Sequence, residues 1–269
     1  MLSWLSRRAL PSRSSRRPEA NSDLAGCPAV LCGDCREIAA AHGPYDLIIA
    51  GPPYCITTLC WDRRVEGRHA LAAALLKPVG SLWVFGSLRY LLADAGRFEA
   101  VGLRYAQDIV WRKANGTGFA ADRFKRVHEI IVQYYRHDAL WRDVYNDVQR
   151  VPATTRNKSV QLRRARTKHT GSIGGGAYHD DGTRIMKSVI EINSVRSGLH
   201  RTEKPVALLA ILMRTSCPTG GLVGDFFAGS GAAGEAAALT GRRYVGCEVD
   251  PLMAAKARAR LNALHNRPS

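Results

Sequence analysis

Short apolar stretches that stop at turn-forming residues recur along this chain. Tyr45–Ala50 runs into Gly51-Pro52-Pro53-Tyr54, and a later stretch stops at Asp225, just before Phe226. Continuous apolar runs of this length are typical of parallel strands that are buried on both faces of a sheet. The carboxyl ends of such strands deliver backbone to a ligand, so we expect these two ends to face one pocket.

Alternation of strand and helix patterns predicts an α/β fold. The predicted strands are Ala29–Cys32, Tyr45–Ala50, Ser81–Phe85, Ala106–Trp111, Val127–Tyr135 and Tyr244–Cys247. The predicted helices are Arg68–Leu76, Leu88–Arg97, Val206–Met213, Ala232–Leu239 and Pro251–His265.

A glycine-rich turn follows Asp225. Gly229, Gly231 and Gly234 remove Cβ atoms where the strand gives way to a helix, so a ligand can approach bare backbone. Glu248 ends the next apolar stretch, about 20 residues on, where a carboxylate suits ribose hydroxyls. A nucleoside-containing cofactor is therefore expected, although a purely structural turn or an ordinary dinucleotide site would show the same spacing.

The position of this turn favours one arrangement of the sheet. Only 21 residues follow Glu248, and they resemble one closing helix with Asp250 as its cap. A dinucleotide fold needs more strands after its glycine turn, so the remaining strands must come earlier in sequence. We therefore predict a circularly permuted Rossmann-like sheet, with a catalytic half at 23–135, an insert at 136–199 and a cofactor half at 200–269.

The order of these segments resembles a known family. GPPY at 51–54, a basic middle, the triplet Glu203-Lys204-Pro205, the DFFAGSG segment at 225–231 and then Glu248 are similar to the permuted, beta-type DNA amino-methyltransferases that use S-adenosylmethionine. The Trp61-Asp62 pair resembles the small phage-type, adenine-specific branch. The likeness covers roughly residues 29–264 and implies a class I methyltransferase fold, often in a restriction–modification context.

The resemblance implies a set of cofactor-binding residues. Phe227, Gly229 and Gly231 match positions that wrap the methionine part, and Asp225 and Ser230 belong to the same turn. Glu248 matches the ribose ligand, Asp34 the contact to the adenine ring, and Lys204 a position near the cofactor carboxylate. A loop aspartate and a surface lysine are the simpler interpretations of Asp34 and Lys204.

The family's catalytic turn is altered here. The resemblance implies that Tyr54 stacks on a flipped base and that the carbonyl of Pro52, which precedes Pro53, accepts a hydrogen bond from the target amine. The family places Asp, Asn or Ser before the first proline, whereas this chain has Gly51. Losing that acceptor is expected to cost on the order of 100- to 1000-fold in rate. Water or Asp62 are possible substitutes.

Charge indicates a nucleic-acid partner. The chain holds 39 Lys and Arg against 23 Asp and Glu, and residues 112–168 alone carry 14 basic and 5 acidic residues. We expect double-stranded DNA to meet the insert and its surroundings, although a solvated charged loop would have the same composition. The candidate DNA contacts are Trp61, Arg112, Lys113, Arg123, Lys125, Arg126, Arg163, Arg164 and Arg166.

The N-terminal segment, the cysteines and the lengths of the apolar runs indicate the cellular compartment. Residues 1–22 are rich in Arg and Ser, so they suit a disordered basic tail, a transit peptide or an arm that touches DNA. Seven cysteines suggest reduced thiols, and the Cys32/Cys35 spacing lacks a second pair, so no metal is expected. No apolar run reaches membrane-span length. A bacterial or phage cytoplasm fits best; monomer and homodimer stay open.

The sequence is compatible with three functions. The first is site-specific methylation of DNA, at adenine N6 more than at cytosine N4. The second, motivated by Gly51, is a DNA-binding protein that keeps the fold without transferring methyl groups. An RNA or small-molecule methyltransferase agrees with the charge but gains nothing from the motif order.

Overall fold

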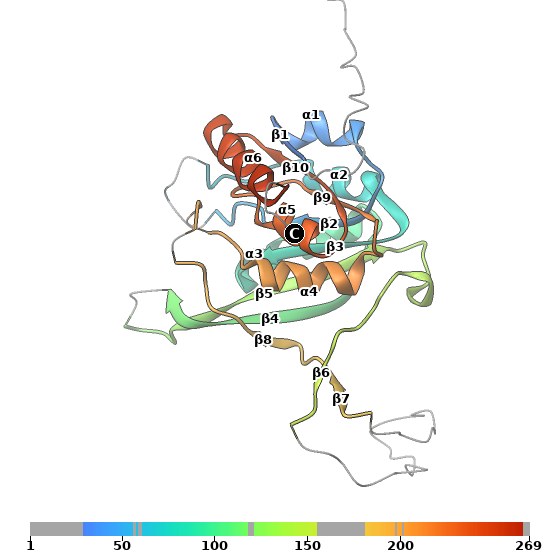
Figure 1. Ribbon diagram of the computed structural model, residues 1–269, viewed down its shortest axis with the longest axis vertical. Coiled ribbons are helices and arrows are strands. Elements are labelled where there is room, and N and C mark those ends of the chain that lie inside the picture. The colour runs from blue at the N-terminus through green and yellow to red at the C-terminus, as the bar shows by residue number, and fades with distance from the viewer. Residues whose placement is uncertain are drawn as a thin grey trace, which may run out of the picture.

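A computed structural model describes residues 29–55, 58, 61–117, 121–154, 181–196, 198–200 and 202–265. The predicted basic tail and the candidate DNA contacts Arg163, Arg164 and Arg166 lie outside this part of the chain. Within it, strands and helices alternate up to residue 117 and again from residue 206 onward, whereas the described residues between them form strands with one short 3-10 helix (Figure 1).

The centre of the fold is an eight-stranded sheet with the order β1-β10-β9-β2-β3-β5-β4-β8. Its strands are β1 (Ala29–Cys32), β2 (Tyr45–Ala50), β3 (Leu76–Gly86), β4 (Leu103–Thr117), β5 (Arg126–Arg136), β8 (Val189–Glu191), β9 (Leu222–Asp225) and β10 (Arg243–Glu248). β1, β10, β9, β2 and β3 are parallel neighbours, whereas β5 is antiparallel to both β3 and β4. The last two strands in sequence therefore lie inside the sheet, between β1 and β2, which confirms the permuted order.

Helices cover both faces of this sheet, giving three layers (Figure 1). One face carries α4 (Val206–Ser216), α5 (Ala232–Leu239) and α6 (Pro251–His265); the other carries α1 (Cys35–Ile38), α2 (Arg68–Leu75) and α3 (Leu88–Ala100). Two short 3-10 helices, Ala39–Ala41 and Trp141–Asp143, and a separate pair of strands, β6 (Arg150–Pro152) and β7 (Thr183–Ile185), complete the described elements.

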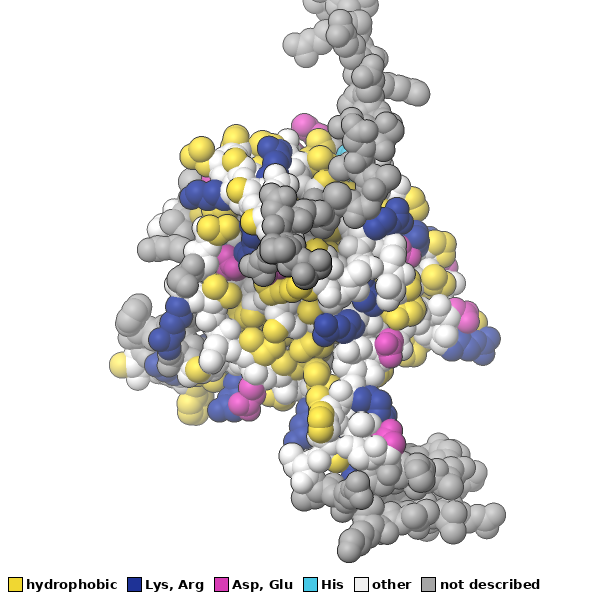
Figure 2. Space-filling view, in the orientation of Figure 1, with side chains coloured by type: hydrophobic (Ala, Val, Ile, Leu, Met, Phe, Trp, Pro, Cys, Tyr) yellow, Lys and Arg dark blue, Asp and Glu magenta, His cyan; other side chains and the backbone are white. Residues whose placement is uncertain are grey.

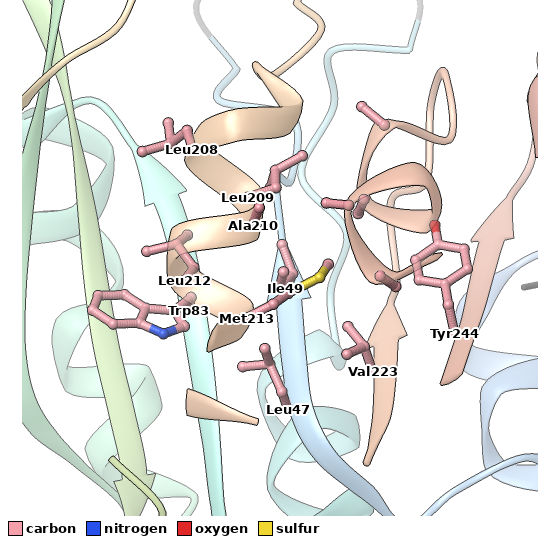
Figure 3. Packing of buried hydrophobic residues seen from close by; sticks show 14 of the residues in the cluster. Leu47, Ile49, Trp83, Leu208, Leu209, Ala210, Leu212, Met213, Val223 and Tyr244 are labelled. Atoms are coloured by element: carbon pink, nitrogen blue, oxygen red, sulfur yellow. The ribbon is translucent and has the colours of Figure 1, made fainter. Parts of the chain in front are cut away.

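Strand β2 shows how the sequence builds both cores. Leu47 and Ile49 point to one face, where Leu212 and Met213 of α4 cover them (Figure 3). Ile48 and Ala50 belong to the cluster on the opposite face, with α2 and α3. Because both faces are buried, every position from Leu47 to Ala50 must be apolar, which is why this strand reads as one continuous run.

The structure corrects several predicted bounds. Leu76 was expected to end a helix, but it adopts extended backbone and opens β3, where it pairs with Tyr45. Pro78, two residues later, disfavours helical backbone at Lys77, which explains the early stop. β4 and β5 are longer than predicted, and β8, inside the predicted insert, returns to the main sheet beside β4.

Strand register brings the two turns together. Ile49 of β2 lies opposite Asp225 of β9, so both strands end at the same level of the sheet. The residues that follow them, 51–54 and 226–231, therefore start from adjacent points on one edge.

Candidate functional site

A cavity of about 800 Å³ opens at the carboxyl ends of the parallel strands. Gly51, Pro52, Pro53 and Tyr54 line one side, and residues 225–230 line another. The segment 199–204 and the end of β10 supply further lining. The two turns singled out in the sequence thus share one pocket.

The proline turn is anchored by Asp62. Its Oδ1 accepts a hydrogen bond of 2.7 Å from the backbone N–H of Cys55, a residue that takes left-handed backbone with φ 56°. Asp62 is only 2% exposed and also lines the cavity, so a carboxylate lies in the same wall as Gly51 and Pro52. Trp61 is exposed at the rim and packs against His200, with ring centroids 5.4 Å apart.

The glycine turn after β9 is built from backbone and small side chains. Gly229 and Gly231 have φ values of +51° and +75°, which other L-residues rarely adopt. A Cβ at Gly231 would lie 3.1 Å from the Cβ of Ala257, so α6 packs directly against this turn. Ser230 is buried beside it and lines the cavity.

Asp225 holds the start of this turn. Its Oδ1 accepts from the N–H of Phe227 at 3.0 Å, and Oδ2 accepts from the hydroxyl of Tyr244 at 3.2 Å. Burial raises the pKa of Asp225 to about 7, although both hydrogen bonds oppose the shift. Phe227 itself lines the cavity.

Two further carboxylates complete this wall. Glu248, at the end of β10, accepts the N–H of Gly229 at 2.8 Å and that of Asp250 at 3.0 Å, one on each oxygen. A carboxylate has about four acceptor sites, so capacity remains for ligand hydroxyls. Asp34 caps α1 by accepting from the N–H of Arg36, whose guanidinium also holds the pKa of Asp34 below its usual value.

Lys204 lies at the Tyr54 side of the cavity. Its Nζ donates to Oε2 of Glu129 at 2.8 Å and lies 3.3 Å from the phenolic oxygen of Tyr54. Lys113, expected as a DNA contact, pairs with the other oxygen of Glu129, and its side chain is 15% exposed. Sequence reasoning missed Glu129; the one signal was a carboxylate inside the largely apolar strand β5.

The other basic candidates lie at the β4–β5 hairpin. Arg123, Lys125 and Arg126 are exposed before and at the start of β5. Arg112 is 55% exposed and pairs with Glu191 of β8. Figure 2 shows Lys and Arg side chains gathered beside the tip of this hairpin. Because Ile130 near the start of β5 pairs with Gly86 at the carboxyl end of β3, these side chains stand at the same edge of the sheet as the cavity.

Metal-binding clusters and membrane-spanning helices are both absent from the described part of the chain. It contains no group of three or more His, Cys, Asp or Glu placed to hold a metal ion. None of its helices is long and apolar enough to cross a membrane.

Comparison with known proteins assigns the family. The sequence profile of the DNA methylase family of N6/N4 type matches residues 45–257, so the chain belongs to this family. A curated relative, "Type II methyltransferase M2.DpnII" of Streptococcus pneumoniae, is 27% identical over 244 residues, covering 81% of this chain and 82% of the relative.

Solved structures share the fold. The M1.HpyAVI–SAM complex matches with a TM-score of 0.60 at 21% identity, covering 86% of this chain and 98% of that one. The cytosine-N4-specific PvuII DNA methyltransferase gives a TM-score of 0.61 at 17% identity, covering 90% and 88%. A putative DNA modification methylase of Thermus thermophilus, complexed with S-adenosyl-L-methionine, gives 0.56 at 22% identity, covering 88% and 93%. The predicted Rossmann-like methyltransferase fold is confirmed.

Proposed function

We propose that this protein transfers a methyl group from S-adenosylmethionine to an exocyclic amine of a base flipped out of duplex DNA. The observation that carries the proposal is the single cavity that the proline turn and the glycine turn share. The Trp61-Asp62 pair favours adenine N6 over cytosine N4. A bacterial or phage cytoplasm and a restriction–modification context accord with the Type II name of the relative.

The glycine-turn side of the cavity fits the cofactor. Gly229 leaves room for a ligand, since among the described residues a Cβ there would meet only the carbonyl of Phe227, at 3.9 Å. Glu248 offers acceptors for ribose hydroxyls, Asp34 lies in the same wall for the adenine ring, and Phe227 offers an apolar ring. When bound, S-adenosylmethionine supplies the methyl group on its sulfonium sulfur.

The proline-turn side fits the base. Tyr54 presents an aromatic ring to the cavity, and stacking of a base on such a ring contributes roughly 1–3 kcal/mol. The carbonyl of Pro52 accepts one amine hydrogen, which draws the nitrogen lone pair out of the ring system. A second acceptor is needed for full activation, and Gly51 has no side chain to supply it.

Asp62 is the candidate for a partial substitute, because its carboxylate already accepts the N–H of Cys55. Its carboxylate is buried in the cavity wall and fixed by the N–H of Cys55, so it is oriented before any base enters. A preoriented acceptor of this kind stabilises developing positive charge on the amine without reorganisation during the reaction.

Labelled S-adenosylmethionine and duplex DNA test the proposal. The protein is incubated with both, and the DNA is digested to nucleosides. Label in N6-methyladenine is expected, and label in N4-methylcytosine would revise the base. Tyr54→Ala serves as the control. Competition by duplex RNA distinguishes an enzyme that acts on RNA from one that acts on DNA. No label in either base at high enzyme concentration contradicts the proposal.

Gly51 favours a second candidate, a DNA-binding protein that keeps the cofactor fold but transfers no methyl group. Steep salt dependence of DNA binding without turnover would support it. Turnover that appears only in Gly51→Asp would show that one missing acceptor separates the two functions.

A further inference from the structure

A compact cluster of charges lies behind Tyr54. Glu129 of β5 is held between Lys113 of β4 and Lys204 from the segment before α4, and all three side chains are 15% exposed. Lys204 donates to Oε2 of Glu129 at 2.8 Å, and Lys113 donates to Oε1. Three separate segments therefore meet on one carboxylate.

Placing a carboxylate here is costly, and the lysines offset that cost. Burial by itself raises the pKa of Glu129, but the two ammonium groups outweigh it and lower the pKa to about 2. Glu129 is therefore ionised at neutral pH and acts as a strong acceptor. A buried ion pair contributes little net stability compared with apolar residues of similar volume, so stability alone is a weak explanation of this cluster.

The third partner of Glu129 is the hydroxyl of Tyr54. This hydroxyl donates to Oε2 of Glu129 at 3.1 Å, and Lys204 donates to the phenolic oxygen at 3.3 Å. Burial raises the pKa of Tyr54 well above its usual value, so the phenol keeps the proton that it donates. Both groups that touch the hydroxyl belong to the cluster.

The ring of Tyr54 is also supported from the side. Tyr90 of α3 packs against it with centroids 5.4 Å apart at 41°, and the hydroxyl of Tyr90 accepts a hydrogen bond from Arg68 of α2. Residues 51–54 lie in no helix or strand, so backbone hydrogen bonding of a regular element does not fix this turn. The contacts of the Tyr54 side chain with Glu129, Lys204 and Tyr90 therefore help to set the orientation of its ring.

We propose that Glu129 is a positioning residue that holds the Tyr54 ring in the orientation that receives the flipped base. Lys113 and Lys204 keep Glu129 in place, so Lys204 acts on the base side of the cavity. The role rests on the proposed function. A ring fixed in advance loses no orientational freedom when the base stacks, and misplacement by about 1 Å can cost on the order of 100-fold in rate.

A mutant cycle tests this role. Glu129→Gln keeps the size but weakens the acceptor and leaves the two lysines without a counter-ion. We expect kcat for methyl transfer to fall roughly 10- to 100-fold, while the Kd for S-adenosylmethionine and the KM for DNA stay within about twofold. In a Tyr54→Phe background the same change should lower kcat less than about threefold, because the shared hydrogen bond is already absent.

Asp46→Asn is the matched control. Asp46 also accepts from a lysine, Lys77 at 2.8 Å, and from the N–H of Leu222, but it lies at the opposite ends of the strands and does not line the cavity. Asp46→Asn should lower the melting temperature without changing kcat. If Glu129→Gln also lowers the melting temperature without changing kcat, the cluster serves stability alone and the proposal is overturned. The proposal is also overturned if the effects of Glu129→Gln and Tyr54→Phe on kcat are additive.

Melting temperatures separate the two possible failures. The melting temperatures of the wild type, the two single variants and the double variant are also compared. Because Glu129 and Tyr54 share one hydrogen bond, the two substitutions should change the melting temperature non-additively. If the wild type and Gly51→Asp both transfer no methyl group, the proposed function fails. Thermal unfolding then still decides whether Glu129 holds Tyr54, and additive melting temperatures overturn that contact.

Discussion

Ile49 of β2 and Asp225 of β9 lie directly opposite each other in the parallel sheet, although 176 positions separate them in sequence. This register places the proline turn and the glycine turn on neighbouring strand ends. In open α/β sheets, ligands bind at the carboxyl ends of strands. The turn proposed to hold the methyl donor and the turn proposed to hold the base therefore line one cavity.

Restoring the missing acceptor should raise the rate. Apart from its two chain neighbours, no heavy atom of the described residues lies within 4 Å of a Cβ built on Gly51, so an Asp side chain has room to enter. We expect Gly51→Asp to increase methyl transfer by roughly 100-fold, the scale of one preorganised polar group. Gly51→Ala adds the Cβ without an acceptor and should give no increase. Equal rates in Asp and wild type would show that another group, such as Asp62, already supplies the acceptor.

Glu248→Gln should weaken cofactor binding. The substitution removes a charge from the group that we assign to the ribose hydroxyls, and hydrogen bonds to charged groups contribute roughly 1.5–3 kcal/mol. The Kd for S-adenosylmethionine, measured by calorimetry, should rise about 10- to 100-fold. Glu37→Gln removes the same charge from the exposed side of α1 and should leave the Kd within about twofold. Similar losses in both variants would point to a general charge effect.

The buried carboxyl of Asp225 should make stability depend on pH. The pKa of Asp225 is about 7 in the folded protein against 3.8 ordinarily, so the folded state binds the proton more tightly. This contribution is complete below about pH 4 and is lost as the pH rises to about 7. At pH 8, Asp225→Asn should therefore be more stable than wild type by roughly 2–4 kcal/mol, with little difference at pH 4.

Denaturant unfolding across this pH range measures the effect. Tyr244→Phe provides a second check, because it removes a hydrogen bond that lowers the pKa of Asp225. In that variant the fall in the free energy of unfolding should extend to higher pH. Parallel stability curves for wild type and Asp225→Asn would contradict the assignment.

The β4–β5 hairpin should carry DNA affinity. Lys125 and Arg126 are exposed beside the cavity, and the charge of Arg126 acts on the pKa of Tyr54, so it lies within electrostatic range of the base site. Reversing both charges should weaken duplex binding by roughly 10- to 100-fold and reduce the slope of log K against log salt by about 1–2. Arg104→Glu, at the far end of β4, is the matched control. Because Arg104→Glu reverses one charge and the hairpin variant reverses two, an equal loss per reversed charge would mean that net charge alone drives binding.

The sheet was predictable because its buried strands read as continuous apolar runs. Tyr45–Ala50 is packed on both faces, so no polar residue interrupts it from Leu47 onward. The end of α2 was not predictable in the same way. Leu76 suits a helix by propensity, but its pairing with Tyr45 and the nearby Pro78 place it in β3.

The site was predictable where its residues are contiguous. The turns at 51–54 and 225–231 are recognisable by their glycine and proline residues, and 51–54 and 225–230 line the cavity, whereas Gly231 packs against Ala257. Glu129 was not, because its lysine partners lie 16 and 75 positions away and are joined only by the packing of β4, β5 and the segment before α4. The assignment of Lys204 to the cofactor carboxylate stays a prediction, and the hydrogen bonds of Lys204 to Glu129 and Tyr54 are instead the basis for the base-side role proposed above.

Sequencing modified bases in living cells tests the central claim most directly. The wild-type chain and Tyr54→Ala are expressed separately in a bacterial host that lacks its own DNA methylation, and the genomic DNA is read for modified bases. We predict N6-methyladenine at one short recurring sequence in cells with the wild type, at higher occupancy with Gly51→Asp, and none with Tyr54→Ala. Unmodified DNA in cells that produce folded wild type and folded Gly51→Asp would contradict the account.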